Sequence, residues 1–130
     1  MKRPIFKKGN FYHVYNRGTD KRSIFLDDDD RLRFIHDLWE FNDTAPAANP
    51  YYRLPIKQSK EVGLPKMAKF AKREPRRLLV KLHVFCLMNN HFHLLLEPIS
   101  DQGVTEFMRK IGTGYTNYFN QKYQRSGVLF

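Results

Sequence analysis

The stretch CLMNNHFHLLLEP, residues 86–98, places two histidines, His91 and His93, inside a run that is otherwise as apolar as a buried strand. In a strand, side chains two positions apart point to the same side of the sheet. The two imidazoles therefore project together, about 7 Å apart along the strand, where they can converge on one divalent ion. The alternate side chains point into a core: Phe92, Leu94 and Leu96.

Two asparagines, Asn89 and Asn90, precede this strand, and asparagine can adopt the positive φ angles that a tight hairpin turn uses. We therefore predict antiparallel strands at about 78–88 and 91–97, joined by this pair. His83 stands in the first of these strands, in a row that can share the side of His91 and His93.

The flanking segments predict one more strand and two helices. Aromatic and β-branched residues dominate residues 11–18, and alternation puts Phe11, His13, Tyr15 and Arg17 on one face of that strand. Two stretches then show apolar residues at helical spacing. The stripes are Leu32, Ile35, Leu38, Trp39 and Asn42 in the first helix, apolar until the last, and Val104, Phe107, Met108, Ile111, Tyr115, Tyr118 and Phe119 in the second.

Periodicity fails between Thr44 and Pro65, which we interpret as an irregular insertion. The order of elements is strand, helix, loop, strand, strand, helix. This order predicts one α+β domain over residues 1–130, with an antiparallel sheet and helices packed on one face.

The composition points to a polyanionic partner. Lys and Arg number 23 against 13 Asp and Glu, a formal net charge of +10 in 130 residues. Nucleic acid is the first such partner and an acidic membrane surface the second, while a merely basic protein is the alternative. No apolar run approaches membrane-spanning length. The single cysteine, Cys86, lies in an apolar run, so we expect a buried thiol and a cytoplasmic protein.

The ion expected on His91 and His93 is magnesium or manganese rather than zinc. The chain has no Cys-x-x-Cys pair, and its one thiol, on Cys86, is expected to be buried. Two histidines on a solvated sheet face with no role are the alternative. The further imidazoles of His13 and His83, which can share this face, favour a site.

Four stretches together resemble the HUH single-tyrosine transposases of insertion sequences, and more narrowly the branch of REP-associated tyrosine transposases. The four stretches are HVYNRG, the IF that follows it, CLMNNHFHLLLEP, and FMRKIGTGYTNYFNQKYQRSGVLF. The HUH triplet, histidine–hydrophobic–histidine, is His91-Phe92-His93. The resemblance covers about residue 8 to the end, except the insertion, and implies the ferredoxin-like HUH nuclease fold.

The resemblance also implies a mechanism. A divalent ion on the two histidines polarises a phosphodiester of single-stranded DNA, and a tyrosine hydroxyl attacks phosphorus to leave a 5′-phosphotyrosine and a free 3′-hydroxyl. Because the bond energy is kept, another strand can be joined without ATP. The implied partner is single-stranded or hairpin DNA, and such enzymes are typically homodimers.

The nucleophile is where this sequence departs from the family. The family's tyrosine lies on a helix beyond the segment that SGVLF would introduce, and the sequence ends at Phe130. We therefore expect the nucleophilic tyrosine beyond Phe130, with a truncated product, a fragment or a lost catalytic helix as the alternatives. Tyr115 and Tyr118 fit the apolar stripe of the last helix, so we predict them to be core residues.

Clustered cations predict the DNA contacts. Arg17 is the residue we most expect near DNA, because Gly18 after it would let backbone approach a ligand. The full set is Lys7, Lys8, Arg17, Arg73, Arg76, Arg77, Arg109 and Lys110. Two functions stay open: an enzyme that nicks and joins single-stranded DNA, and a DNA-binding remnant without chemistry. A metal enzyme acting on small substrates is disfavoured by the charge and the lack of a Gly-rich cofactor loop.

Overall fold

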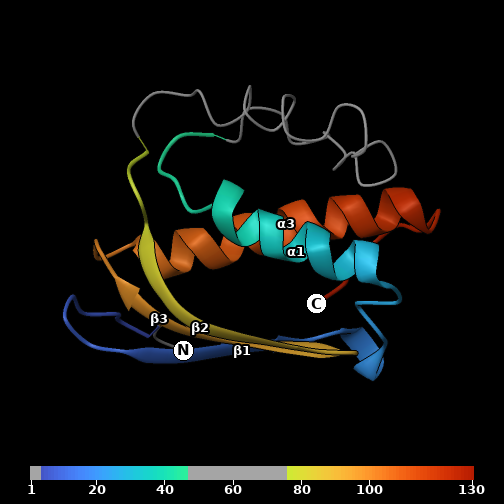
Figure 1. Ribbon diagram of the computed structural model, residues 1–130, viewed down its shortest axis with the longest axis horizontal. Helices are drawn as coiled ribbons and strands as arrows, with labels where there is room; N and C mark the ends of the chain where they lie inside the picture. The colour runs from blue at the N-terminus through green and yellow to red at the C-terminus, as the bar shows by residue number, and fades with distance from the viewer. Residues whose placement is uncertain (1–3, 47–75) are drawn as a thin grey trace.

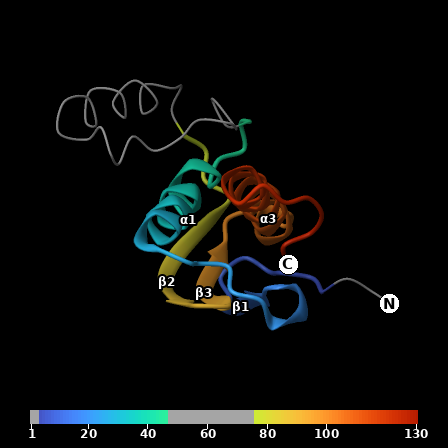
Figure 2. The same cartoon turned by 90° about the vertical axis from the view of Figure 1, so that its right-hand side faces the viewer.

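The computed structural model describes residues 4–46 and 76–130, which form a three-stranded antiparallel sheet with two helices on one face (Figures 1 and 2). The elements are β1 (Tyr12–Arg17), the 3-10 helix η1 (Thr19–Lys21), α1 (Asp28–Glu40), β2 (Val80–Met88), β3 (His91–Pro98) and α3 (Gly103–Lys122). The predicted α+β class is confirmed. Most of the expected insertion, and Arg73, lie outside the described residues.

The strand that carries the two histidines lies at the centre of the sheet. The strand order is β1-β3-β2, and β3 pairs antiparallel with both neighbours. Figure 2 shows α1 and α3 side by side against the same face of the sheet. The opposite face, which we call the open face, is covered by neither helix, so a side chain that points there can meet a ligand.

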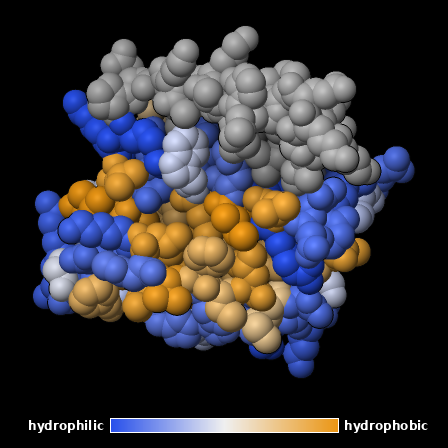
Figure 3. Space-filling view, in the orientation of Figure 1, coloured by the Kyte–Doolittle hydropathy of each residue, from blue (hydrophilic) through white to orange (hydrophobic). Residues whose placement is uncertain are grey.

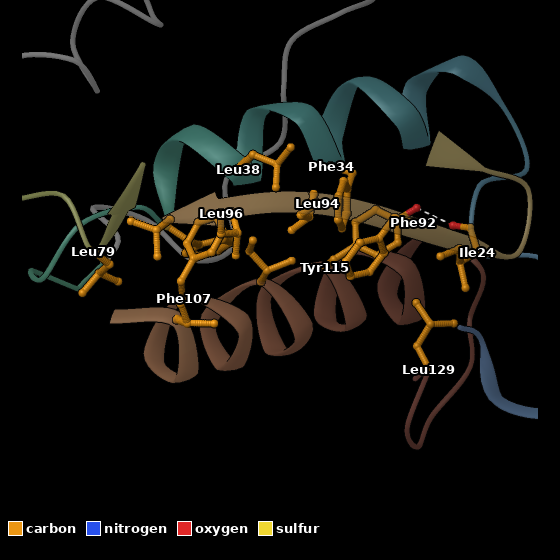
Figure 4. Close-up of a cluster of buried hydrophobic side chains, with 14 of the residues drawn as sticks. Ile24, Phe34, Leu38, Leu79, Phe92, Leu94, Leu96, Phe107, Tyr115 and Leu129 are labelled. Carbon is orange, nitrogen blue, oxygen red and sulfur yellow. Dashed lines mark hydrogen bonds between the residues drawn. The ribbon is translucent and has the colours of Figure 1, made fainter. Parts of the chain in front are cut away.

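The core fills the space between the helices and the sheet. Phe92, Leu94 and Leu96 of β3 are at most 1% exposed and point toward α3, as Figure 4 shows. The predicted stripe of α3 is confirmed. Its members Val104, Phe107, Ile111, Tyr115 and Phe119 are buried, and Met108 and Tyr118 pack against the cluster at its edge.

Most of the predicted stripe of α1 lies beside β2, but only two of its five positions are buried. Leu38 and Asn42 are buried, but Leu32, Ile35 and Trp39 are each more than a third exposed. The helix instead buries an ion pair, in which Arg33 Nε lies 3.2 Å from Asp37 Oδ1. The attraction between the two charges offsets part of the cost of removing them from water, and burial still raises the pKa of Asp37 to about 7.

The displaced apolar residues of α1 line a groove beside the edge strand β2. Ile35 and Trp39 meet Phe85 of β2 there, and Figure 3 shows apolar side chains gathered over this part of the molecule. Arg76 also lines the groove, and its guanidinium stacks over the Trp39 ring at 4.1 Å. The apolar spacing of α1 therefore identified a contact surface, but not the one that faces the core.

A β-bulge corrects the expectation that Cys86 is buried. The pairing of β2 with β3 shifts between Leu82 and Val84, so one extra residue, His83, enters β2. Since side chains alternate, an extra residue moves every later side chain to the other face. Cys86 consequently pairs with His93 and is exposed on the open face, while Leu87 packs against the core.

The hairpin turn is where the sequence predicts it, but its backbone differs. Among the described residues, neither Asn89 nor Asn90 has a positive φ. Their carbonyls accept hydrogen bonds from the segment after β1: Asn89 O from Ile24 N at 2.8 Å, and Asn90 O from Gly18 N at 2.9 Å. The turn is thus fixed by the neighbouring segment, which also ties β1 to the tip of the hairpin that carries the histidines.

The approach of the two helices depends on Gly114 of α3. A Cβ built there would lie 2.3 Å from two ring carbons of Phe41, and that ring is 6% exposed. We expect Gly114→Ala to lower the free energy of unfolding by about 1–3 kcal/mol, the usual cost of overpacking. Gly112→Ala is the matched control, because a Cβ there meets nothing within 4 Å.

The control should be neutral or stabilise the protein by up to about 1 kcal/mol, since alanine is the better helix former. Urea unfolding followed by circular dichroism measures both variants. Equal stability of the two alanine variants would show that the helices do not pack as closely as described.

Candidate metal and nucleic-acid site

Three histidines meet on the open face, where β1 and β3 run side by side. In the pairing of these strands Tyr15 lies opposite His93 and Arg17 opposite His91. Facing residues of antiparallel strands share a side, so the row predicted on residues 11–17 does lie beside the two histidines. His13 is the diagonal neighbour of His93 in this register.

Cross-strand contacts bring the imidazoles together. His13 Nε2 lies 2.8 Å from His93 Nδ1, and the two rings are stacked with centroids 5.0 Å apart. The rings of His91 and His93 are also 5.0 Å apart, nearly perpendicular to each other. His83 does not join this cluster, because it lies 3.3 Å from Glu97 and against the ring of Phe11.

The orientation of His91 is set by the hairpin turn. Its Nδ1 lies 2.7 Å from Asn90 Oδ1, and the amide of Asn90 in turn donates to the Lys21 carbonyl at 3.3 Å. Since an amide oxygen can only accept, His91 Nδ1 carries the proton and donates. In the neutral ring this tautomer places the lone pair on the other nitrogen, Nε2, which is the atom then available to a metal ion.

The surroundings of His93 favour its neutral form. Loss of hydration, followed by the neighbouring imidazoles of His13 and His91, lowers the pKa of His93 below its ordinary value. A lowered pKa means that the ring carries a lone pair on one nitrogen at neutral pH. The arrangement can accept an ion, but within residues 4–46 and 76–130 no three His, Cys, Asp or Glu side chains are already gathered as a metal site.

The tyrosines of α3 lie on the opposite side of the sheet from the histidines. Tyr115 is fully buried and its hydroxyl donates to the Ile24 carbonyl at 2.5 Å (Figure 4). The hydroxyls of Tyr118 and Tyr123 donate to the two carboxylate oxygens of Asp30, at 2.8 and 2.6 Å. By contrast, Tyr15 is 65% exposed on the open face, with its ring centroid 5.9 Å from that of His93.

The cations predicted to contact DNA fall into two groups. Arg17, Lys7, Lys8, Arg77 and Arg109 are exposed. Arg76 and Lys110 instead hold the end of α1: Arg76 donates to the Trp39 and Asn42 carbonyls, and Lys110 to those of Asp43 and Ala45. These two side chains have a structural task whether or not they meet DNA.

Gly18 has a different role from the one expected. It is buried, and a Cβ built on it would lie 2.4 Å from the Arg22 carbonyl. The glycine is therefore required by the packing of the chain on itself, in the segment that follows β1. Arg17 remains exposed on the open face beside it, opposite His91.

The described part of this strongly basic chain therefore gathers imidazoles on the sheet face that neither α1 nor α3 covers. Residues 52–128 match the family described as transposase IS200-like. This match covers more than half of the 130 residues, so the chain belongs to the IS200-like transposases. The matched segment includes β2, β3 and α3 but not β1.

Two other comparisons found nothing. No curated protein and no solved structure matched the chain. Separately, none of the helices in the described part of the chain is long and apolar enough to cross a membrane.

Proposed function

We propose that this chain binds structured single-stranded DNA over its open face, and that His91 and His93 hold a divalent ion there for cleavage and rejoining of the strand. The observation that carries the proposal is the register of β1 and β3. It places Arg17 opposite His91, and Tyr15 opposite His93, on the sheet face that neither α1 nor α3 covers. Membership of a transposase family makes DNA the expected polyanion.

Each group on this face has a defined task. Arg17 is a cation for a phosphate, and the exposed ring of Tyr15 is a platform on which an unpaired base can stack. A divalent ion bound to the two histidines would supply a Lewis acid for the phosphodiester. Asn90 holds the ring of His91 by its 2.7 Å hydrogen bond, so the Nε2 lone pair faces away from the turn.

A DNA-binding protein without chemistry is the second candidate. One observation favours it: the hydroxyls of Tyr115, Tyr118 and Tyr123 are all engaged on the helix side of the sheet. A nucleophile must come from elsewhere for cleavage to occur. Homodimerisation and a cytoplasmic location, which the resemblance and the lone thiol imply, belong to this proposal and are tested by light scattering and cell fractionation.

We expect the chain to bind a DNA hairpin with a single-stranded flank at least about 10-fold more tightly than a blunt duplex, because only unpaired bases can stack on exposed rings. If Lys7, Lys8 and Arg17 contact three phosphates, affinity should fall roughly 20-fold between 50 and 200 mM salt. Fluorescence anisotropy with labelled hairpin and duplex measures both quantities. Equal affinity for the hairpin and the duplex, unchanged by salt, would contradict the proposal.

Two variants locate the surface that binds. Arg17→Ala should weaken hairpin binding by roughly 5–10-fold, the effect of about 1 kcal/mol at one phosphate contact. Arg31→Ala is the control, because Arg31 lies on α1 and pairs with Asp28 at 3.2 Å. A larger loss in the Arg31 variant than in the Arg17 variant would place the DNA on the helices instead.

A further inference from the structure

We propose that His13 is a third imidazole ligand of the ion held by His91 and His93, which makes the site one of three nitrogens that prefers Zn²⁺ or Co²⁺ to Mg²⁺. The inference rests on the metal site of the proposed function and assigns its third ligand and its class of ion. It concerns β1, which lies outside the segment matched to the family.

The distance between His13 and His93 is close to what one shared ion requires. Two nitrogens that each lie about 2.1 Å from an ion, at angles of 90 to 109°, are roughly 3.0–3.4 Å apart. His13 Nε2 and His93 Nδ1 are now 2.8 Å apart, joined by a hydrogen bond. Two bonds to one ion therefore require these nitrogens to separate by a few tenths of an ångström, and the two stacked rings to turn until both lone pairs point at the ion.

The surroundings allow that shift. His13 is exposed, and its partner Leu95 in the strand pairing is only partly buried, so its ring can rotate without disturbing the core. His91 completes the set, because Asn90 occupies its Nδ1 and leaves Nε2 available. The ring of His93 stands between the other two, with centroids 5.0 Å from each.

The donor set favours borderline ions over hard ones. Imidazole nitrogen suits zinc, cobalt and related ions, whereas magnesium prefers carboxylate, carbonyl and water oxygens. Among the described residues of the open face, the one carboxylate in the strand pairing is Glu97, which lies with His83 and Lys81 at the other end. Cys86 is exposed opposite His93, so the reason for excluding zinc, a buried thiol, does not hold.

The test compares His13→Gln with His83→Gln in the full chain. His83 is the matched control: it is a histidine of the same sheet that contacts Glu97 and Phe11 instead of the cluster. Calorimetric titration with Co²⁺ and Zn²⁺ gives affinities, and circular dichroism confirms the fold of each variant. We expect His13→Gln to lose more than about 100-fold in affinity, beyond the roughly 10–100-fold typical of a group that only orients a ligand.

Nuclear magnetic resonance of the imidazole nitrogens supplies a direct reading. Addition of Zn²⁺ should shift His13 Nε2 together with a nitrogen of His91 and of His93, leave His83 unchanged, and persist in a large excess of Mg²⁺. If His13→Gln binds Co²⁺ as the unmodified protein does, or if Mg²⁺ displaces Zn²⁺, this inference is overturned while the His91 and His93 site stands. If the unmodified protein binds none of these ions, the proposed metal site fails as well.

Discussion

Replacing His91 and His93 together by alanine should abolish all manganese-dependent signals of this protein and leave its fold intact. Both imidazoles lie on the open face, in register with Arg17 and Tyr15, and neither α1 nor α3 covers that face. Removing them deletes the proposed ion ligands and two hydrogen bonds, that between His13 and His93 and that between His91 and Asn90. We expect a change of less than about 2 kcal/mol in the free energy of unfolding, because each of these hydrogen bonds has a usual net worth of about 1 kcal/mol.

Phe92→Ala is the matched control, because Phe92 stands between the two histidines and points the other way. Its side chain is 1% exposed, with its ring centroid 4.7 Å from that of Phe34. Its truncation should cost about 3–5 kcal/mol. Manganese binding is followed by electron paramagnetic resonance, and stability by urea unfolding.

The double histidine variant and Phe92→Ala thus test the open face and the core face of the same strand separately. A double histidine variant that unfolds would show that the imidazoles support the structure. A double variant that folds and still binds manganese with unchanged affinity would move the site elsewhere.

The parts of this fold that the sequence predicts are those where one physical pattern acts alone. The alternation in β3 places Phe92 and Leu94 correctly, because a central strand with one covered face has a single way to bury apolar side chains. The stripe of α3 holds for the same reason, since this long helix has one face on the sheet.

The errors arise where a second effect intervenes. In α1, the buried pair of Arg33 and Asp37 occupies the core side, so Ile35 and Trp39 line the groove beside β2. Nothing in the spacing of apolar residues reveals that two charges will neutralise each other in the interior. In β2 the extra residue at His83 reverses the alternation, and no local signal at that position marks a bulge.

The candidate site was predictable in its residue types but not in its geometry. Alternation alone predicts that His13 and Tyr15 share a face, and likewise that His91 and His93 do. Which of these side chains touch depends on the register between β1 and β3, a long-range property of the chain. The 2.8 Å contact between His13 and His93 follows from that register, and it is the basis for assigning a third ligand.

No nucleotide adduct should form on Tyr115, Tyr118 or Tyr123 when the protein is incubated with a cleavable DNA hairpin and a divalent ion. A tyrosine that attacks phosphorus must stand in line with the leaving oxygen, close to the phosphate. The helix layer lies about 10 Å from the sheet it covers, and the histidines are on the sheet's far side. A hydroxyl between helix and sheet cannot reach a phosphate held there.

The chemistry of these hydroxyls points the same way. Burial, and then the charge of Asp30, raises the pKa of Tyr115 above its ordinary value. Burial and a hydrogen bond to Asp30 raise the pKa of Tyr118 in the same direction, and that of Tyr123 to about 12. Since the attacking form is the phenolate, a raised pKa makes each a poorer nucleophile at neutral pH.

Peptide mapping by mass spectrometry after incubation identifies any tyrosine that carries a nucleotide. Tyr118→Phe and Tyr123→Phe should bind the hairpin as tightly as the unmodified chain, because both hydroxyls serve Asp30 on the helix side. Tyr15→Phe is compared with these two variants, since Tyr15 is a described tyrosine that shares the open face with the histidines. An adduct on any of the three α3-side tyrosines would require DNA to reach the helix layer, and would show that the active face has been assigned to the wrong side of the sheet.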